Sequence, residues 1–364
     1  MYPIKAAAIR MPKLENRTAM KHLPSLATAT AAALLACLAA APGAEKCAPA
    51  PPESKSPSAR NLPKLQEQFL SWKFGMFLHF NMATFANVEW ANGHEDPAIF
   101  APKQLDCGQW ADAAKAAGMK YAVLTVKHTG GWCLWDSQCT DHDIAQFKNF
   151  RGGKGDLVKE FTDAFRKRGM KVGFYYCFPL CGKRWPDYWT LPLEGYRKGD
   201  CDSLSFIKNQ FTELLTNYGE ISVIWCDQSG TKNGGIKKGD WEKIKAHVHS
   251  LQPDCLVIAN NQTNYALTDI YGYEFPYSHK LPPAQNKNPS EVCDKIQGGW
   301  FSRSKGSPAV ASAKYIVDEM LVPLNANRSN ILLNCGPDAR GLLPDSVVER
   351  LKEVGKRWKE KGGK

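Results

Sequence analysis

Two acidic residues each close an apolar, strand-like run of the chain. Asp227 ends the segment SVIWCD, and Glu274 ends DIYGYE. A carboxylate at the end of a buried strand is held rigidly and suits a nucleophile. A glutamate among aromatic neighbours has a raised pKa and suits a general acid. Paired carboxyl groups of these two kinds are what glycoside hydrolysis requires, so we predict Asp227 as nucleophile and Glu274 as acid/base.

Polar and aromatic residues close the other apolar runs. Sugars present hydroxyl groups at their rims and apolar C–H faces between them, so such residues together would form a sugar pocket. The predicted ring contains His79, His128, Tyr175 or Tyr176, Asn260 with Asn261, Trp300 and Asn334.

Eight strands are predicted to carry these residues. Most of them have apolar residues at consecutive positions, which is typical of a parallel sheet covered on both faces. The predicted strands are Lys73–Phe80, Tyr121–His128, Lys171–Phe178, Ser222–Gln228, Cys255–Asn261, Asp269–Glu274, Gly299–Arg303 and Asn330–Gly336.

Amphipathic helices are predicted between the strands. They are Cys107–Gly118, Asp156–Gly169, Asp202–Tyr218, Lys238–Leu251, Ala309–Leu321 and Pro344–Lys359. This alternation predicts an α/β fold of the (β/α)8 TIM-barrel type, in which the chemistry lies at the carboxyl ends of the strands. A doubly wound open sheet is the alternative, but the first strand is not followed by the glycine-rich phosphate loop that such a fold would favour.

The first 44 residues are typical of a secretory leader. A basic start at Met20 precedes an Ala/Leu-rich run and small residues. We therefore expect residues 1–44 to be a leader, 45–62 a disordered Pro/Ser-rich linker and 63–364 the catalytic domain. The expected location is periplasmic, cell-envelope or secreted, and Cys37 in the segment LLAC is a candidate for lipidation and membrane anchoring.

The charge pattern does not favour a nucleic-acid partner. The formal net charge is +11, of which the leader contributes +4 because it carries five basic residues and Glu15. The remaining +7 is scattered, which indicates a solvated surface, although an anionic polysaccharide substrate remains open. We predict no metal site and no cofactor.

Twelve cysteines in an exported chain suggest disulfide bonds, but their positions favour burial. Cys177 with Cys181, or Cys139 with Cys201, are possible pairs. Five cysteines, including Cys177, lie in apolar runs, where cysteine usually acts as a small buried hydrophobe. They are Cys133, Cys177, Cys226, Cys255 and Cys335.

Several ordered segments resemble the glycoside hydrolase family 29 α-L-fucosidases. They are KFGMFLHF, the Glu-Trp pair in VEW, the turn KHTGGW, the strand IWCDQ, and the late segments GGWF and ILLNCGPDARG. The resemblance covers about residues 63–360. It implies a retaining, metal-free, exo-acting hydrolase of terminal α-L-fucosyl residues, with a fucosylated glycan as substrate.

The resemblance also assigns roles to individual residues. Asp227 matches the family's nucleophile, and Glu274 matches the acid/base of one of its branches, with Glu291 as the alternative. The substrate-binding positions that it implies are His79, Glu89, Trp90, His128, Thr129, Tyr175, Trp225 and Trp300.

The chain departs from the family pattern at three places. Thr129 and Gly130 stand where the family has a second histidine and an aspartate, and Asn81 replaces a glycine. Loss of one hydrogen bond to a sugar hydroxyl can alter specificity strongly. We also expect no C-terminal β-sandwich after the barrel. The alternatives are a retaining hydrolase of a different sugar and a non-catalytic carbohydrate-binding homologue.

Overall fold

The computed structural model describes residues 60–363, apart from residues 147, 149, 179–202 and 228–238. The predicted leader with Cys37, and the predicted linker as far as residue 59, lie outside the described residues. Cys181 and Cys201, the suggested disulfide partners, also lie outside them.

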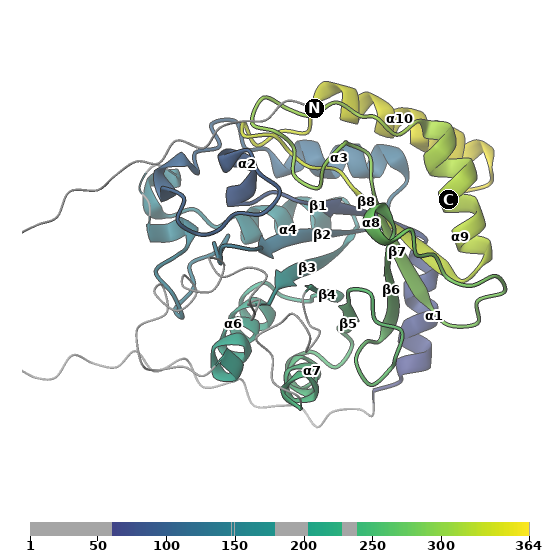
Figure 1. The fold of residues 1–364 in the computed structure, drawn as a ribbon, viewed down its shortest axis with the longest axis horizontal. Helices are drawn as coiled ribbons and strands as arrows, with labels where there is room; N and C mark the ends of the chain where they lie inside the picture. Colours follow the sequence, from purple (N-terminus) through teal and green to yellow (C-terminus); the bar gives the residue numbers. More distant parts are fainter. Residues whose placement is uncertain (1–59, 147, 149, 179–202, 228–238, 364) are drawn as a thin grey trace, which may run out of the picture. The chain divides into compact units, whose positions relative to one another are not determined.

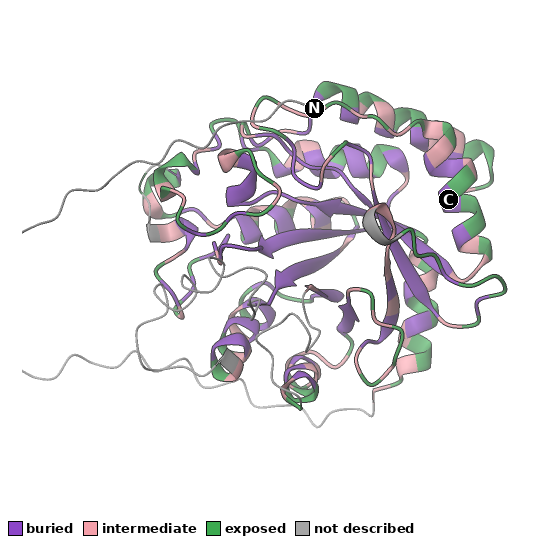
Figure 2. Ribbon diagram, in the orientation of Figure 1, coloured by how far each residue is buried: buried purple, intermediate pink, exposed green. Residues whose placement is uncertain are grey.

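Eight parallel strands form a closed barrel in sequence order, with β8 paired to β1 (Figure 1). This confirms the predicted (β/α)8 fold class and excludes the open doubly wound sheet. Most strand residues are fully buried because side chains fill the barrel interior and helices cover its outside (Figure 2). The strands are β1 (Phe74–Leu78), β2 (Tyr121–Lys127), β3 (Lys171–Cys177), β4 (Val223–Asp227), β5 (Leu256–Ala259), β6 (Ile270–Glu274), β7 (Ser290–Lys295) and β8 (Ser329–Asn334).

The helices bury one face against the barrel and expose the other (Figure 2). Asp106 and Asp156 cap the N-termini of α3 and α4 by accepting backbone N–H groups. Residues 260–269, all described, join β5 to β6 without a helix. The longer helices are α1 (Leu62–Trp72), α3 (Cys107–Ala117), α4 (Leu157–Lys167), α6 (Ser203–Asn217), α7 (Asp240–Leu251) and α10 (Asp345–Glu360).

The described residues also contain shorter helical segments. Of the predicted helix Ala309–Leu321, residues 309–312 are not helical, and Tyr315–Leu321 is a π-helical segment that continues into α9. The short segments are α2 (Met82–Ala86), η1 (Pro97–Ile99), η2 (Ile144–Gln146), η3 (Arg151–Gly153), α8 (Phe275–Ser278), η5 (Tyr315–Leu321) and α9 (Val322–Ala326).

The predicted position of the seventh strand was wrong. The strand is β7, Ser290–Lys295, and the predicted segment Gly299–Arg303 lies in the loop that follows it. The β7 sequence SEVCDK looks polar, but hydrogen bonds satisfy its carboxylates. Glu291 is fully buried and accepts from Tyr121 and Trp225, and Asp294 accepts from Tyr315 at 2.7 Å. Aromatic residues at Trp300 and Phe301 made the wrong segment look more strand-like.

The first helix was not predicted, although its sequence carries the signals of a helix start. Asn61 caps it by accepting from the N–H of Lys64, and Pro63 occupies its first turn. Gln66 and Phe69 form its buried face. Arg60, Asn61 and Leu62 therefore belong with the barrel rather than with a linker.

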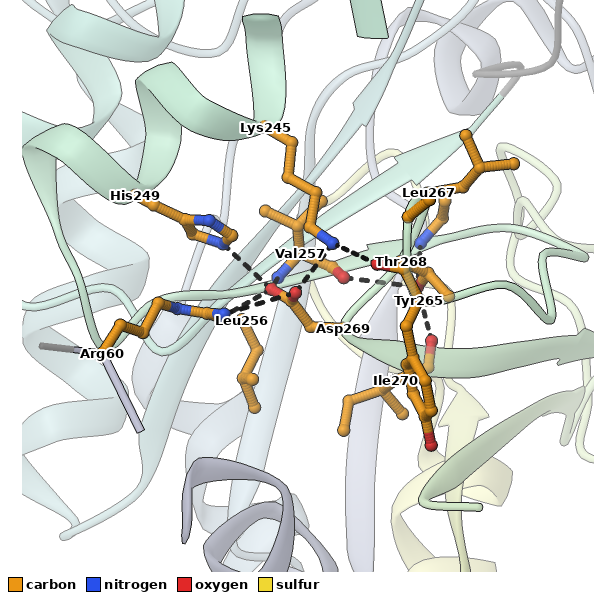
Figure 3. Close-up of polar contacts among 12 residues, drawn as sticks. Arg60, Lys245, His249, Leu256, Val257, Tyr265, Leu267, Thr268, Asp269 and Ile270 are labelled. Carbon is orange, nitrogen blue, oxygen red and sulfur yellow. Dashed lines mark hydrogen bonds and ion pairs between the residues drawn. The ribbon is translucent and has the colours of Figure 1, made fainter. Parts of the chain in front are cut away.

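Arg60 attaches this N-terminal segment to a buried carboxylate between β5 and β6 (Figure 3). Asp269 is completely buried and accepts hydrogen bonds from Arg60 at 2.7 Å, His249 at 2.9 Å and the Val257 N–H at 2.8 Å, while Lys245 lies 2.9 Å away. Burial acts to raise the pKa of Asp269, but the hydrogen bond from His249 and the surrounding positive charges hold it well below its usual range.

A second buried carboxylate lies inside the barrel. Glu291 accepts hydrogen bonds from the Tyr121 hydroxyl at 2.5 Å and from Trp225 Nε1 at 2.9 Å. Gly75 on β1 leaves room for Tyr121, because a Cβ atom at that position would lie 2.4 Å from the tyrosine ring. Burial raises the pKa of Glu291 to about 7. Glu291 thus links β2, β4 and β7 across the barrel interior.

The eight cysteines among the described residues are all free thiols, and seven of them are buried. The five that were predicted to pack as small hydrophobes are all buried in the core. Among the described helices, none is both long and apolar enough to cross a bilayer.

Replacing Asp269 by Asn should destabilise the barrel. The substitution leaves Arg60 and Lys245 beside a neutral amide, and removing one partner of a buried ion pair costs about 3 kcal/mol or more. Urea unfolding would measure the loss. The control is Asp163→Asn, which breaks an exposed ion pair with Lys159 and should change the free energy of unfolding little. Equal effects of the two substitutions would contradict the role of Asp269.

Glu291 should make the stability of the protein depend on pH. Its pKa rises on folding from 4.5 to about 7, so the folded state binds the proton more tightly. This contribution to stability is complete below pH 4.5, and it is lost as the pH rises to about 7. In the wild-type protein the free energy of unfolding should fall by up to about 3 kcal/mol across this window because of Glu291. In Glu291→Gln this fall should be absent. The exposed control Glu319→Gln should keep the wild-type slope. A slope in Glu291→Gln equal to that of wild type would refute the assignment.

Candidate active site

A pocket opens at the carboxyl ends of the strands, on the face where barrel enzymes place their chemistry. Its volume of about 120 Å³ suits a single small ring better than an extended chain. All the predicted catalytic and substrate-binding residues line it except Glu89 and Thr129, and Asn261 and Asn334 of the predicted ring do not line it either. The lining residues are Phe77, His79, Trp90, His128, Tyr175, Trp225, Asp227, Asn260, Glu274, Cys293 and Trp300.

The two predicted catalytic carboxylates meet in this pocket. Asp227 ends β4 and Glu274 ends β6, and Asn260 directly follows β5 between them. The side-chain nitrogen of Asn260, Nδ2, donates to Asp227 Oδ1 at 3.1 Å and to Glu274 Oε2 at 2.8 Å. The two acceptor oxygens are therefore less than about 6 Å apart, close to the roughly 5–5.5 Å carboxyl separation of retaining glycosidases and below the roughly 6.5–9.5 Å of inverting ones.

Glu274 has the properties of an acid. Burial raises its pKa, and the negative charge of Asp227 raises it further, whereas hydrogen bonds from Asn260 and Asn261 act in the opposite direction. Asn261 also accepts from the Glu274 N–H at 3.2 Å, so its side chain holds both the backbone and the carboxylate. Glu274 can thus keep a proton at a pH at which an ordinary glutamate has lost it.

Asp227 is oriented from both sides. The Tyr175 hydroxyl donates to its Oδ2 at 2.8 Å, while Asn260 holds Oδ1. Tyr175 itself stacks between Trp225, at 5.4 Å between ring centroids, and His128, at 5.3 Å. This stack of rings fixes the tyrosine and, through it, the carboxylate.

The two histidines of the pocket are uncharged. Burial lowers the pKa of His79 to about 3 and that of His128 well below its usual value. Asn334 donates through Nδ2 to the Trp300 carbonyl, so its Oδ1 faces His79 Nδ1 at 2.7 Å as an acceptor. His79 Nδ1 therefore carries the proton, and Nε2 is left as a hydrogen-bond acceptor suited to a hydroxyl group.

Thr129 acts on the pocket through His128. Its hydroxyl lies 3.1 Å from His128 Nδ1, and its side chain is buried without lining the pocket. Thr129 can therefore set the ring orientation and tautomer of His128. The geometry does not favour the direct contact between Thr129 and a bound sugar that the sequence suggested.

Trp90 lines the pocket, whereas Glu89 acts on it through Trp300. Glu89 Oε2 accepts from the Trp300 N–H at 2.9 Å, so this carboxylate holds the loop that carries Trp300. Trp90 lines the pocket yet is 46% exposed, as expected of an aromatic platform at an entrance. Trp300 is largely buried and packs on His79, with ring centroids 4.9 Å apart.

Glu291, the alternative acid/base, is not among the residues lining the pocket. Tyr121 and Trp225 occupy its two oxygens. Sequence reasoning missed Phe77 and Cys293 as lining residues. Phe77 lies two residues before His79 and so shares its side of β1, which is a signal that could have identified it. Cys293 was missed because it belongs to β7.

Within the described ranges, no group of three or more His, Cys, Asp or Glu residues is arranged to hold an ion.

Comparisons with known proteins identify the family of this chain. The family profile described as Alpha-L-fucosidase matches residues 93–364. Alpha-L-fucosidase 1 of Arabidopsis thaliana is 31% identical over 80% of this chain, and plasma alpha-L-fucosidase of Homo sapiens is 27% identical over 85%. This chain covers 60% of the Arabidopsis protein and 70% of the human protein.

A solved structure also matches the barrel. Alpha-L-fucosidase isoenzyme 1 of Paenibacillus thiaminolyticus superposes with a TM-score of 0.65 at 29% identity, covering 82% of this chain and 77% of that one. With the profile match over more than half of its length, the chain belongs to the α-L-fucosidase family, glycoside hydrolase family 29.

Proposed function

We propose that this protein is an exo-acting α-L-fucosidase that removes terminal α-L-fucosyl residues from glycans with retention of configuration. The observation that carries the proposal is the Asp227–Asn260–Glu274 arrangement, in which one amide joins an oriented carboxylate and a carboxyl group of raised pKa. The size of the pocket favours release of one terminal sugar.

The proposed reaction has two displacements. Asp227 attacks the anomeric carbon while Glu274 gives its proton to the glycosidic oxygen, which breaks the bond to the leaving saccharide and forms a glycosyl ester on Asp227. Glu274, now ionised, removes a proton from water as the water attacks the same carbon. The ester bond breaks, and the sugar leaves with its original configuration.

The remaining pocket residues would recognise the sugar. Two neutral imidazoles, His79 and His128, suit hydroxyl groups, because a charged ring would cost more to desolvate. Trp90, Trp225 and Trp300 offer flat apolar faces to the C–H groups of the ring.

Thr129 supports a second candidate, a retaining hydrolase of a different sugar. It stands where the family pattern has another histidine, and it bonds to His128 without lining the pocket. A panel of aryl glycosides would identify the sugar. Calorimetry with free L-fucose, beside a test for aryl fucoside turnover, would detect a protein that binds sugar without catalysis.

We also propose that the protein is exported, on the basis of the leader pattern in residues 1–44. Cys37 is the candidate lipidation site. Mass spectrometry of the mature N-terminus would distinguish cleavage before a lipidated Cys37 from an ordinary signal cleavage further along.

Substituting Asp227 by Gly should lower turnover of an aryl α-L-fucoside by a factor of about 10⁴ or more, because the nucleophile is lost. Azide added to this variant would attack the anomeric carbon directly and yield the inverted β-fucosyl azide. NMR of the product would report its configuration. Near-wild-type turnover in Asp227→Gly, or an α-azide as its product, would rule out Asp227 as the nucleophile.

Glu274→Gln should slow fucosides with poor leaving groups by about 10²–10⁴-fold. Dinitrophenyl fucoside should be less affected in its first step, because its leaving group needs no proton. The wild-type rate should fall as the pH rises through the raised pKa of Glu274, and the variant should lack that decrease. In the comparison variant Glu291→Gln we expect any loss to be the same for both leaving groups. If only Glu291→Gln depended on the leaving group, Glu291 would be the acid/base.

A further inference from the structure

A second cavity, of about 440 Å³, adjoins the monosaccharide pocket. Three places in the chain contribute to both, because one residue lines the pocket and a residue one or two positions away lines the cavity. These pairs are Trp90 with Glu89, Cys293 with Lys295, and Trp300 with Phe301. Consecutive Cα atoms are only about 3.8 Å apart, so the two spaces share a wall. A ligand that extends past this wall would leave the pocket and enter the cavity.

The second cavity lies on the side of the acid. Glu274 closes β6 and is paired with Cys293 on the neighbouring strand β7 (Figure 1). Lys295 lies two residues further along β7, so its side chain emerges on the same face of the strand as that of Cys293. In the proposed reaction the saccharide that receives the proton of Glu274 must lie beside this residue. The leaving saccharide can therefore extend into the second cavity.

Residues 301–310 supply much of the cavity wall, and hydrogen bonds hold this segment in place. Arg303 Nη1 donates to the Asn87 carbonyl at 2.6 Å, which fixes the guanidinium on another loop. The Val310 N–H donates to the Ile296 carbonyl at 2.8 Å, directly after β7. A wall that is ordered before the ligand arrives loses little further entropy on binding.

The lining of the cavity matches both kinds of surface that a sugar ring offers. Pro308 is exposed and Val310 is 64% exposed although both side chains are apolar, so they can pack against the C–H face of a ring. Arg303 and Glu89 supply a donor and an acceptor for the hydroxyl groups at its rim. Gly299 leaves room for Glu89 Oε1, because a Cβ atom there would lie 2.2 Å from that oxygen.

We propose that the second cavity is a subsite for the sugar ring to which the terminal fucose is attached. This rests on the proposed function and names its substrate class, which is fucosylated oligosaccharides with a recognised second ring rather than fucosides in general. The ring packs on Pro308 and Val310, and its hydroxyl groups bond to Glu89 and Arg303. Trp300 stands between the fucose in the pocket and the leaving ring in the cavity.

The test compares methyl α-L-fucoside with fucosyl-galactose disaccharides of each possible linkage. Both kinds of substrate release an alcohol that needs the same proton, so they differ chiefly in the second ring. We expect kcat/KM for at least one disaccharide to exceed that for methyl α-L-fucoside by about 10- to 100-fold, because the second ring adds one or two hydrogen bonds. The preferred linkage would show how the leaving ring is turned in the cavity.

Arg303→Ala should abolish most of this preference while leaving turnover of methyl α-L-fucoside unchanged, because that substrate has no second ring. The matched control is Lys305→Ala, which removes an exposed side chain two residues away that does not line the cavity. Val310→Asp should also weaken the preference, whereas Val322→Asp, at another exposed valine, should not. Equal use of methyl α-L-fucoside and every disaccharide by wild type, or equal effects of Arg303→Ala and Lys305→Ala, would overturn the proposal.

Binding measurements separate this proposal from the proposed reaction. Calorimetry of the same substrates on Asp227→Asn reports affinity without turnover. Tighter binding of a disaccharide than of methyl α-L-fucoside that depends on Arg303, even where wild type releases no fucose, would uphold the subsite and refute the reaction. Turnover with no preference for any disaccharide would uphold the reaction and refute the subsite.

Discussion

The register of three neighbouring strands determines the geometry of the candidate site. Tyr175, Trp225 and Ile258 are paired along β3, β4 and β5, and Asn260 continues the ladder by donating its N–H to the Cys226 carbonyl at 2.8 Å. A one-residue slip would turn every side chain to the other face of its strand. The closed barrel prevents such a slip, and Asn260 can therefore hold Asp227 and Glu274 with one amide group.

Two buried carboxylates, one inside the barrel and one between β5 and β6, help to hold this register. Glu291 joins Tyr121 to Trp225 inside the barrel, and Asp269 joins Arg60, Lys245 and His249 between β5 and β6. Each carboxylate is satisfied by several donors, as burial requires. The strands that carry Asp227 and Glu274 are thus fixed by interactions distant from the pocket.

The site is organised as neighbouring regions of different charge. Neutral histidines and aromatic rings form the walls of the pocket, and the carboxyl groups of Asp227 and Glu274 lie side by side in it. Low dielectric inside the pocket strengthens the interaction between Asp227 and Glu274, which is part of what raises the pKa of Glu274.

The pattern of residues along the chain was sufficient to predict the fold class, seven of the eight strands and most residues of the pocket. Apolar runs closed by Asp227, Glu274, His79 and His128 predict buried strands with polar ends, and a parallel barrel gathers such ends at one mouth. These features are properties of short segments, so the chain displays them without its three-dimensional context.

Tertiary structure alone decided the rest. The polar segment SEVCDK becomes β7 because Tyr121, Trp225 and Tyr315 satisfy its carboxylates, and these partners lie far away in the chain. The choice of Glu274 over Glu291 for the pocket and the bridging role of Asn260 likewise depend on contacts between different strands. Hydrogen bonds and charge interactions act through space, and a linear pattern does not record which distant residues the barrel brings together.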